Sequence, residues 1–175
     1  MIEFTTPDPC LIDRITDQFG ALSNLSRHPV DWYDGRTQMI VSWPRAEQLF
    51  QALRFPVDHP VREMLRVETN PIRAKMTVKP RVDQMVVKPR SEQDLENMRA
   101  VLRAKVVQHP TVLECLRSTG RRVIVEDCSR RASGSGLYWG AMRVRGREHA
   151  WRGDNVLGGL WMLLRAELPG VGGPE

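Results

Sequence analysis

Two short segments in the first third of the chain place polar side chains inside otherwise apolar patterns. Ser23 and Asn24 lie within FGALSNLSRHPV, and Glu47 and Gln48 lie within PRAEQLFQALRF. A carboxylate can stabilise positive charge or activate water, and an amide can both donate and accept hydrogen bonds. These residues are therefore candidates for binding and chemistry, and the question becomes which elements position them.

The second segment predicts an amphipathic helix that ends at Phe55. Its apolar residues recur at i, i+3, i+4 and i+7, and Pro44 falls in the expected first turn. Glu47, Gln51 and Arg54 form a second stripe that borders the apolar one. We therefore expect Glu47 near the helix N-terminus and beside the core. The alternative is an ordinary first-turn glutamate that interacts favourably with the helix dipole.

The pair of segments resembles the signature of the NADAR family, whose bacterial members include N-glycosidases of riboflavin intermediates. Members resemble F-G-x-F-S-N-F followed by E-H-x-F-Q-A-x-K-F, whereas this chain has Gln48 in place of His and Arg54 in place of Lys. Three later segments extend the match in order, namely NPIRAK, LRAKVVQHP with LRSTG, and YWG with GDNVLGGLWMLLR. Five ordered matches across residues 19–168 are far more specific than any one of them.

The resemblance implies hydrolysis of a ribosyl C1–N bond. Cleavage builds positive charge on the ribose, so a carboxylate near C1 can stabilise that charge or activate water. A lysine offers a second route, because an amine can attack C1 and hold the sugar as a Schiff base. On this basis catalysis is assigned to Glu47, Lys75 and Asp154, and substrate binding to Ser23, Asn24, Gln51, Trp139, Gly153 and Asn155.

Each assignment has a plainer alternative. Asp154 and Asn155 suit ordinary helix caps, and Lys75 suits a surface lysine. Asn24 suits a turn, and Trp139 suits the core. The family resemblance is what favours the site. It also makes the amides at the start of the last helix a natural phosphate site for an ADP-ribose or ribosyl-phosphate ligand.

Two departures from the family pattern bear on the substrate. Many members have D-x-x-W-G, whereas the position three before Trp139 is Gly136 and the preceding loop is the basic RRASGSG. A D-W pair before the long helix is also absent, with Pro89 and Arg90 near that place. The resemblance therefore implies that the basal chemistry can survive while specificity changes.

The charge of the chain favours anionic partners. The net charge is +5, and the densest basic stretches are residues 130–136 and 143–153. Solvated loops are the alternative for both stretches. Trp151 among arginines suggests contact with nucleic acid, because arginine pairs with phosphates and aromatic rings stack on bases.

Composition also restricts the class of protein. No run of 18 apolar residues and no signal-peptide pattern occurs, so we expect no membrane partner. The three cysteines are irregularly spaced, which argues against a disulfide framework or a structural zinc and favours a reducing compartment. We expect a cytoplasmic protein that uses no metal and no cofactor.

The 175 residues suffice for one core, so we expect a single domain over residues 1–170 and a flexible tail over 171–175. The expected fold class is a helix-rich α+β domain with a small sheet. A short helix from Pro60 should bury Val61, Met64 and Leu65, and residues 77–90 should be irregular or a short strand.

The second half of the chain alternates helix and strand signals. A capping box at Ser91 predicts a helix to His109, and another helix should end at Gly120. Strands are expected over residues 122–127 and 137–144. A final helix should follow, capped by Asp154 and Asn155 and ending at Pro169. Its buried face should consist of Leu157, Leu160, Trp161 and Leu164.

The favoured function is removal of ADP-ribose from guanine bases of nucleotides or nucleic acid. One alternative is an N-glycosidase that acts on phosphoribosyl intermediates of riboflavin synthesis. Another is a non-catalytic module that binds ADP-ribose or nucleic acid. The expected partner is thus an ADP-ribosyl or phosphoribosyl substrate, together with nucleic acid where that carries the modified base.

Overall fold

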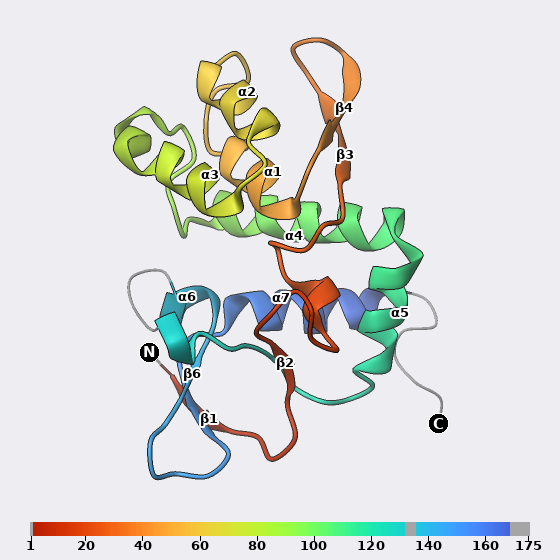
Figure 1. The fold of residues 1–175 in the computed structure, drawn as a ribbon, viewed down its shortest axis with the longest axis vertical. Helices are drawn as coiled ribbons and strands as arrows, with labels where there is room; N and C mark the ends of the chain where they lie inside the picture. The colour runs from red at the N-terminus through yellow and green to blue at the C-terminus, as the bar shows by residue number, and fades with distance from the viewer. Residues whose placement is uncertain (1, 132–135, 169–175) are drawn as a thin grey trace. The chain divides into compact units, whose positions relative to one another are not determined.

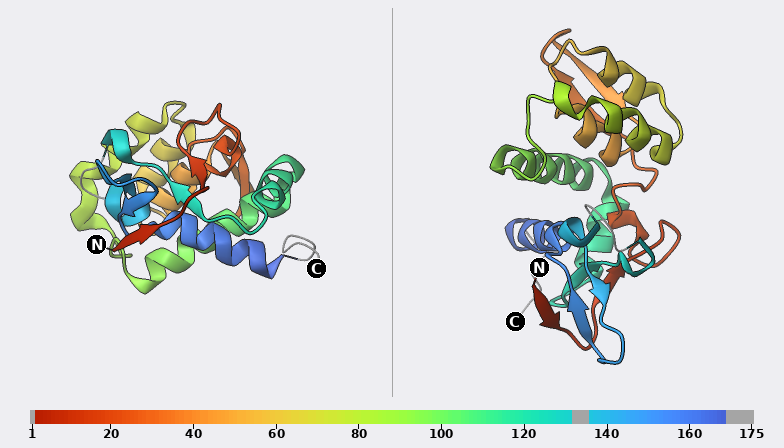
Figure 2. Two further views of the ribbon diagram at one scale, coloured as in Figure 1. Left: turned by 90° about the horizontal axis from the view of Figure 1, so that it is seen from below. Right: turned by 90° about the vertical axis from the view of Figure 1, so that its left-hand side faces the viewer.

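The computed structural model describes residues 2–131 and 136–168, and the chain divides into two compact units. One unit is the central stretch, residues 24–110, and the other combines residues 1–23 with 111–175. The ribbon views show the helices and strands of each unit (Figure 1, Figure 2).

The central unit is a group of helices with one β-hairpin. The short helix α1 packs against three other helices and one strand, and all of its residues are buried. Its elements are β3 (Val30–Asp34), β4 (Met39–Trp43), α1 (Ala46–Ala52), α2 (Pro60–Val67), α3 (Pro71–Val78), the 3-10 helix η2 (Lys79–Gln84) and α4 (Glu92–Gln108). α1 is therefore the element around which this unit is built.

The predicted helix around Glu47 is confirmed, although it is shorter than expected. It begins at Ala46 because Arg45 has an extended backbone, with φ −155° and ψ 156°, so the expected place of Pro44 in the first turn is wrong. The helical residues end at Ala52, three before Phe55. The apolar periodicity predicted the helix but not its ends, which are the least reliable feature of such patterns.

The two helices that follow agree only in part with expectation. α2 begins at Pro60 and buries Val61 and Leu65, but Met64 is 46% exposed, so its predicted burial is wrong. Residues 71–84 form α3 and η2, so the expected irregular segment or short strand at 77–90 is wrong over its first part. The valines there favoured a strand, yet α3 packs against α1 and α2, and tertiary packing overrides such propensities.

The long helix α4 confirms its predicted start and end. The Ser91 hydroxyl accepts a hydrogen bond from the backbone N–H of Asp94 at 3.3 Å, and the helix ends at Gln108. Met98, Val101 and Leu102 are buried. This helix forms the base of the unit beneath α1, α3 and the hairpin (Figure 1).

The other unit combines small sheets with helices. β1, β7 and β6 form an antiparallel sheet in that order, and β2 pairs in parallel with β5. The elements are β1 (Glu3–Thr5), β2 (Cys10–Ile12), η1 (Gly20–Leu22), α5 (Pro110–Ser118, whose first residue ends the central unit), β5 (Ile124–Glu126), η3 (Ser129–Arg131), α6 (Gly136–Trp139), β6 (Met142–Arg143), β7 (Ala150–Arg152) and α7 (Val156–Glu167).

Three expectations about this unit are confirmed and one is wrong. The buried strand appears as β5, Gly120 follows α5 with φ +53°, and the predicted apolar face of α7 is buried. Residues 137–144 do not form one strand, because the chain is helical as far as Trp139 and only Met142 and Arg143 pair. The amide of Gly140 closes the helical turn by donating to the carbonyl of Gly136 at 2.7 Å.

The fold is α+β and helix-rich, as predicted. The single domain over residues 1–170 remains a prediction, and the expected tail at 171–175 lies outside the described residues. No helix in the part of the chain that the structure describes combines the length and apolar character that crossing a bilayer requires. The cytoplasmic location also remains a prediction.

Candidate active site

Glu47 occupies the predicted position at the start of α1 and beside the core. It is 6% exposed, and its backbone N–H donates to the carbonyl of Asn24 at 3.1 Å. The side-chain amide of Gln51, one turn later, donates to Oε1 of Glu47 at 2.9 Å. A buried carboxylate needs such partners, because an unpaired buried charge is strongly unfavourable.

Lys75 supplies the opposite charge. Its Nζ lies 3.3 Å from Oε1 of Glu47, and its side chain is 54% exposed while that of Glu47 is 7% exposed. Lys75 comes from α3, the helix that sequence analysis did not predict. The structure therefore brings together three of the predicted site residues, Glu47, Gln51 and Lys75, in the central unit.

Behind Gln51 lies a buried ion pair that sequence analysis did not identify. Arg54 forms two hydrogen bonds with Asp94, from Nε to Oδ1 at 2.7 Å and from Nη2 to Oδ2 at 2.8 Å. Asp94 is fully buried, and its Oδ2 also accepts from the backbone N–H of Arg90 at 2.7 Å. Such two-pronged pairing fixes the plane of the guanidinium.

The ion pair determines how Gln51 is oriented. Nη1 of Arg54 donates to the amide oxygen of Gln51 at 2.9 Å. Since the oxygen of Gln51 faces a cation, its NH₂ group is the part that faces Glu47. Asp94, Arg54 and Gln51 thus form a chain of contacts that ends on the candidate catalytic carboxylate.

Asn24 lies beside this group and carries an unused acceptor. It is 7% exposed, and its Nδ2 lies 3.3 Å from the sulfur of Met98. Its Oδ1 is buried and has no hydrogen-bond partner among the described residues. A buried acceptor without a partner is unfavourable, and a ligand donor could satisfy it.

Gln48 stands where the family pattern has histidine, and it is fully buried. Its side-chain amide donates to the carbonyl of Leu65 at 2.8 Å and to the carbonyl of Glu68. These carbonyls lie at the C-terminal end of α2, where helical carbonyls lack partners within the helix. The contacts of Gln48 therefore fasten α2 to α1.

A second buried polar group in the central unit surrounds Lys105, within the predicted LRAKVVQHP segment. Its Nζ donates to the Ser26 hydroxyl at 2.8 Å, and Nδ1 of His28 lies 2.9 Å from the same oxygen. Burial lowers the pKa of His28, and the positive charge of Lys105 acts in the same direction. His28 therefore favours its neutral form.

The remaining predicted site residues lie in the other unit, starting with the predicted phosphate site. The backbone amides of Gly153, Asp154 and Asn155 donate to the carbonyls of Ile2, Leu137 and Gly140 at 3.0, 2.7 and 3.1 Å. These amides are therefore occupied, and α7 itself begins one residue later, at Val156. Asp154 is exposed at this turn.

Asn155 does not cap α7 with its side chain, so that expectation is wrong. Its Nδ2 donates to the carbonyl of Ile124 at 2.8 Å, and its Oδ1 accepts from the backbone N–H of Glu126 at 3.0 Å. The side chain thus clamps β5 to the start of α7. Its backbone has φ +50°, a conformation that asparagine tolerates better than most residues.

Trp139 and Ser23 also belong to this unit. Trp139 ends α6 and is half-buried, with its ring 5.0 Å from that of Tyr138 in an edge-to-face arrangement. Ser23 is 6% exposed, and its backbone N–H donates to the carbonyl of Gly20 at 3.1 Å. The roles of both residues in substrate binding remain predictions.

The basic stretches carry less free charge than their composition indicates. Nη2 of Arg130 lies 3.4 Å from Oδ2 of Asp13, and Arg147 and Arg152 both pair with Glu3, at 2.8 and 2.6 Å. Residues 132–135 of the first stretch lie outside the described residues.

Trp151 is 1% exposed, with the guanidinium carbon of Arg143 lying 4.7 Å from its ring centre. The expectation that this ring stacks on bases is therefore wrong, because stacking requires an accessible face.

Comparison with known proteins shows which proteins the chain is similar to in sequence and fold. The sequence model of the NADAR domain matches residues 12–169. N-glycosidase YbiA of Escherichia coli is 32% identical over 153 residues, which cover 87% of this chain and 84% of the relative. The Shigella boydii protein of the same name is 31% identical over the same coverage.

A solved structure shows the same fold. The NMR structure of the E. coli protein YbiA aligns with a TM-score of 0.63 and 28% sequence identity. The alignment covers 93% of this chain and 87% of that one. The similarity therefore extends over nearly the whole chain.

Proposed function

The chain belongs to the NADAR domain family and is an N-glycosidase, and we propose that it removes ADP-ribose from guanine bases of nucleotides or nucleic acid. The observation that carries the chemistry is the buried carboxylate of Glu47, which is contacted on one oxygen by both Gln51 and Lys75. A carboxylate held in this way can stabilise positive charge on a ribose ring.

The two oxygens of Glu47 differ in a way that suits this role. Gln51 donates to Oε1 and the closest approach of Lys75 is also to Oε1, whereas Oε2 accepts no hydrogen bond from the described residues. Oε2 is thus the atom available to face C1 of the sugar or to take a proton from an attacking water. Gln51 keeps the carboxylate in place because Arg54 fixes its amide.

Lys75 can take either of two roles. As an ammonium group it would stabilise the charge of Glu47. As a nucleophile it must first lose a proton, and Glu47, 3.3 Å from Nζ, is close enough to accept it. The free amine would then attack C1 as the bond to the base breaks. Trapping of a covalent sugar adduct with borohydride distinguishes these roles.

The other assigned residues would hold the substrate. The unpaired Oδ1 of Asn24 suits a ribose hydroxyl, because it needs a donor. Asp154 keeps its proposed catalytic role from the family resemblance, and Trp139 suits stacking on a ring. Gly153 and Asn155 shape the backbone turn that carries Asp154.

The basic character of the chain favours ADP-ribose on a guanine base, since both a diphosphate and nucleic acid are anionic. A phosphoribosyl intermediate of riboflavin synthesis is the second candidate, favoured by identity to N-glycosidase YbiA together with the family resemblance. The non-catalytic binding module is not retained, because the relatives are named N-glycosidases.

Direct comparison of substrates tests this proposal. The protein would be incubated with DNA carrying ADP-ribosylated guanine, with NAD and with the phosphoribosyl riboflavin intermediate, and the released sugar would be resolved by chromatography. We expect ADP-ribose from the modified DNA, and release at least about 100-fold slower when Glu47→Gln replaces the wild type. Release from the riboflavin intermediate alone would transfer the proposal to the second candidate.

A further inference from the structure

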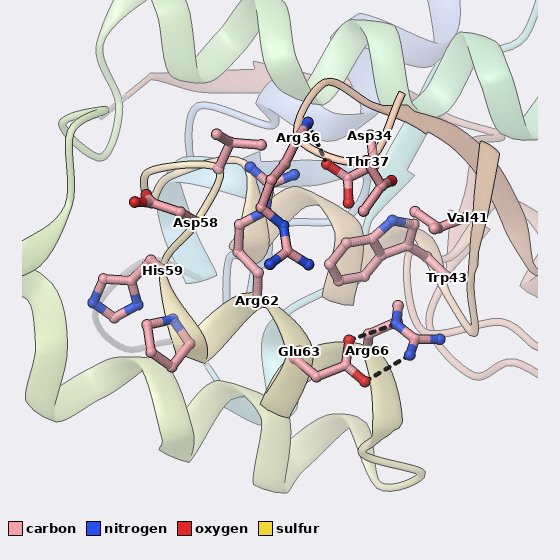
Figure 3. A pocket seen from close by; sticks show the side chains of 12 residues that line it. Asp34, Arg36, Thr37, Val41, Trp43, Asp58, His59, Arg62, Glu63 and Arg66 are labelled. Carbon is pink, nitrogen blue, oxygen red and sulfur yellow. Dashed lines mark hydrogen bonds and ion pairs between the residues drawn. The ribbon is translucent and has the colours of Figure 1, made fainter. Parts of the chain in front are cut away.

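A cavity of about 310 Å³ lies in the central unit between the β3–β4 hairpin and the first part of α2 (Figure 3). None of the residues assigned to the active site lines it. Its volume is within the range of small-molecule sites. Any ligand of this cavity would therefore bind apart from the residues assigned to N-glycosidase chemistry.

Two arginines from different elements meet in this cavity. Arg36 comes from the hairpin turn and Arg62 from α2, and Figure 3 shows the two side chains next to each other on the same side of the Trp43 ring. Their positive charges are close enough to interact, and neither side chain forms a hydrogen bond or ion pair with the described residues. Arg62 is half-buried, so water does not fully compensate for the missing partner.

The electrostatics of Arg62 agree with this picture. Burial lowers the pKa of its guanidinium, and the neighbouring charge of Arg36 acts in the same direction, opposed by Asp34. The carboxylate of Asp34 already accepts a hydrogen bond from the backbone N–H of Arg36 at 2.9 Å. The acid thus shapes the hairpin turn without pairing with either guanidinium.

A third arginine in the same cavity provides an internal contrast. Arg66 donates to both oxygens of Glu63, from Nη2 at 2.6 Å and from Nε at 2.8 Å. Arg66 is therefore paired within the protein. Arg36 and Arg62 form no ion pair with the described residues, although the charge of Asp34 acts on both from a longer distance. Asp58 also lines the cavity, but it is exposed and forms no ion pair with any described residue.

We propose that this cavity binds a small phosphate-bearing anion, held jointly by the guanidinium groups of Arg36 and Arg62. A guanidinium presents planar, paired donors that match the oxygens of a phosphate, and two of them would balance a doubly charged group. A cavity of about 310 Å³ suits a phosphate ester or diphosphate better than the backbone of a nucleic-acid duplex. The site is separate from the proposed function, because it uses none of its residues.

Binding of inorganic pyrophosphate tests this proposal. Isothermal titration would give the dissociation constant, and the indole N–H signal of Trp43 in an NMR titration would locate the site. Charge-assisted hydrogen bonds predict a loss of about 10-fold for Arg62→Gln and about 100-fold for the double variant with Arg36→Gln. Arg66→Gln is the matched control and should change the affinity by less than about 3-fold, because Arg66 is already paired.

Three outcomes would overturn the proposal. In the first, the double variant binds pyrophosphate as the wild type does. In the second, the wild type binds without moving the Trp43 signal. In the third, pyrophosphate does not bind but a single-stranded oligonucleotide binds and loses affinity in the double variant, which would assign the arginines to nucleic acid.

The variant Glu47→Gln shows whether pyrophosphate binds in this cavity or at the active site. We expect it to bind pyrophosphate with wild-type affinity, and a loss there would place the anion at the active site, against the proposal. Circular dichroism would verify that each variant is folded, and we expect it to be, because neither arginine side chain is hydrogen-bonded within the described structure.

Discussion

The two units hold their candidate site residues in place through different kinds of contact. In the central unit, side chains act on side chains, since Asp94 fixes Arg54, Arg54 orients Gln51, and Gln51 holds Glu47. In the other unit, main-chain contacts dominate, because the amides of residues 153–155 donate to carbonyls of two distant segments, one at Ile2 and one at residues 137–140. One unit depends on charge and the other on backbone geometry.

The difference decides which kinds of substitution each unit should tolerate. A chain of buried charges is sensitive to removal of one member, since the partner is left uncompensated. A close-packed backbone turn is sensitive instead to an added methyl group, whatever its polarity. The contrast therefore makes four predictions, in order of decreasing expected effect.

Asp94→Ala should have the largest effect, on stability. Removing one partner of a buried pair costs about 3–5 kcal/mol, and Arg54 would keep its charge with no acid to match it. Urea unfolding would measure the change. Glu63→Ala, which breaks the exposed pair with Arg66, is the control and should cost at most about 1 kcal/mol. Equal losses of stability in the two variants would contradict the role of buried charge in the central unit.

Gly153→Ala should destabilise the other unit through its backbone. The glycine has φ +147°, and an added Cβ would lie 2.3 Å from the carbonyl oxygen of Gly140. We expect a loss of about 1–3 kcal/mol from backbone strain, with more from the clash.

Gly159→Ala is the matched control within α7, where an added Cβ meets no atom within 4 Å. It should stabilise the protein by about 0.5–1 kcal/mol, because alanine favours a helix. The same unfolding experiment measures both variants. If Gly153→Ala were as stable as Gly159→Ala, the close packing of this turn would be refuted.

The third prediction asks whether Lys75 acts only as the charge partner of Glu47 or also as a nucleophile. If Lys75 is the nucleophile, borohydride added during turnover should leave a covalent sugar adduct on it. Mass spectrometry of digested protein would locate the adduct. Should none form while Lys75→Arg stays active, Lys75 would serve as the charge partner of Glu47.

The basic stretches of the other unit should have the smallest effect. Neutralising Arg130, Arg131, Arg143 and Arg145 should flatten the salt dependence of binding to modified DNA, and the slope should fall by about one for each phosphate that an arginine no longer neutralises. The ion pair of Arg130 with Asp13 makes the total change smaller than four phosphates would give. Turnover of a free ADP-ribosyl nucleoside is the control, and an equal loss on it would assign these arginines to the fold.

The sequence predicted the parts of the site that follow from local spacing. The helical period placed Glu47, Gln51 and Arg54 on one stripe, and the structure joins all three. The carboxylate that anchors them, Asp94, is 40 residues beyond Arg54, and its spacing from Ser91 indicated only a helix cap. Long-range pairing of this kind leaves no periodic signal.

The failures arose where packing overrode local preference. Residues 77–90, with their valines, were expected to be irregular or a short strand, but the first two of them end α3, which carries Lys75 to Glu47. Residues 137–139 suited a strand by composition, yet they are helical up to Gly140, where the chain runs too close to Glu126 for any side chain. Backbone contacts between distant segments determine such places, and composition does not record them.

The measurement that tests the central claim most directly is turnover by Glu47→Gln on ADP-ribosylated guanine. The substitution keeps the size of the side chain and removes the charge. Turnover should fall by at least about 100-fold, the lower range for a positioned acid–base group, while the unfolding midpoint verifies that the variant is folded. A folded variant with near-normal turnover would contradict the assignment of Glu47 as the carboxylate that supports cleavage.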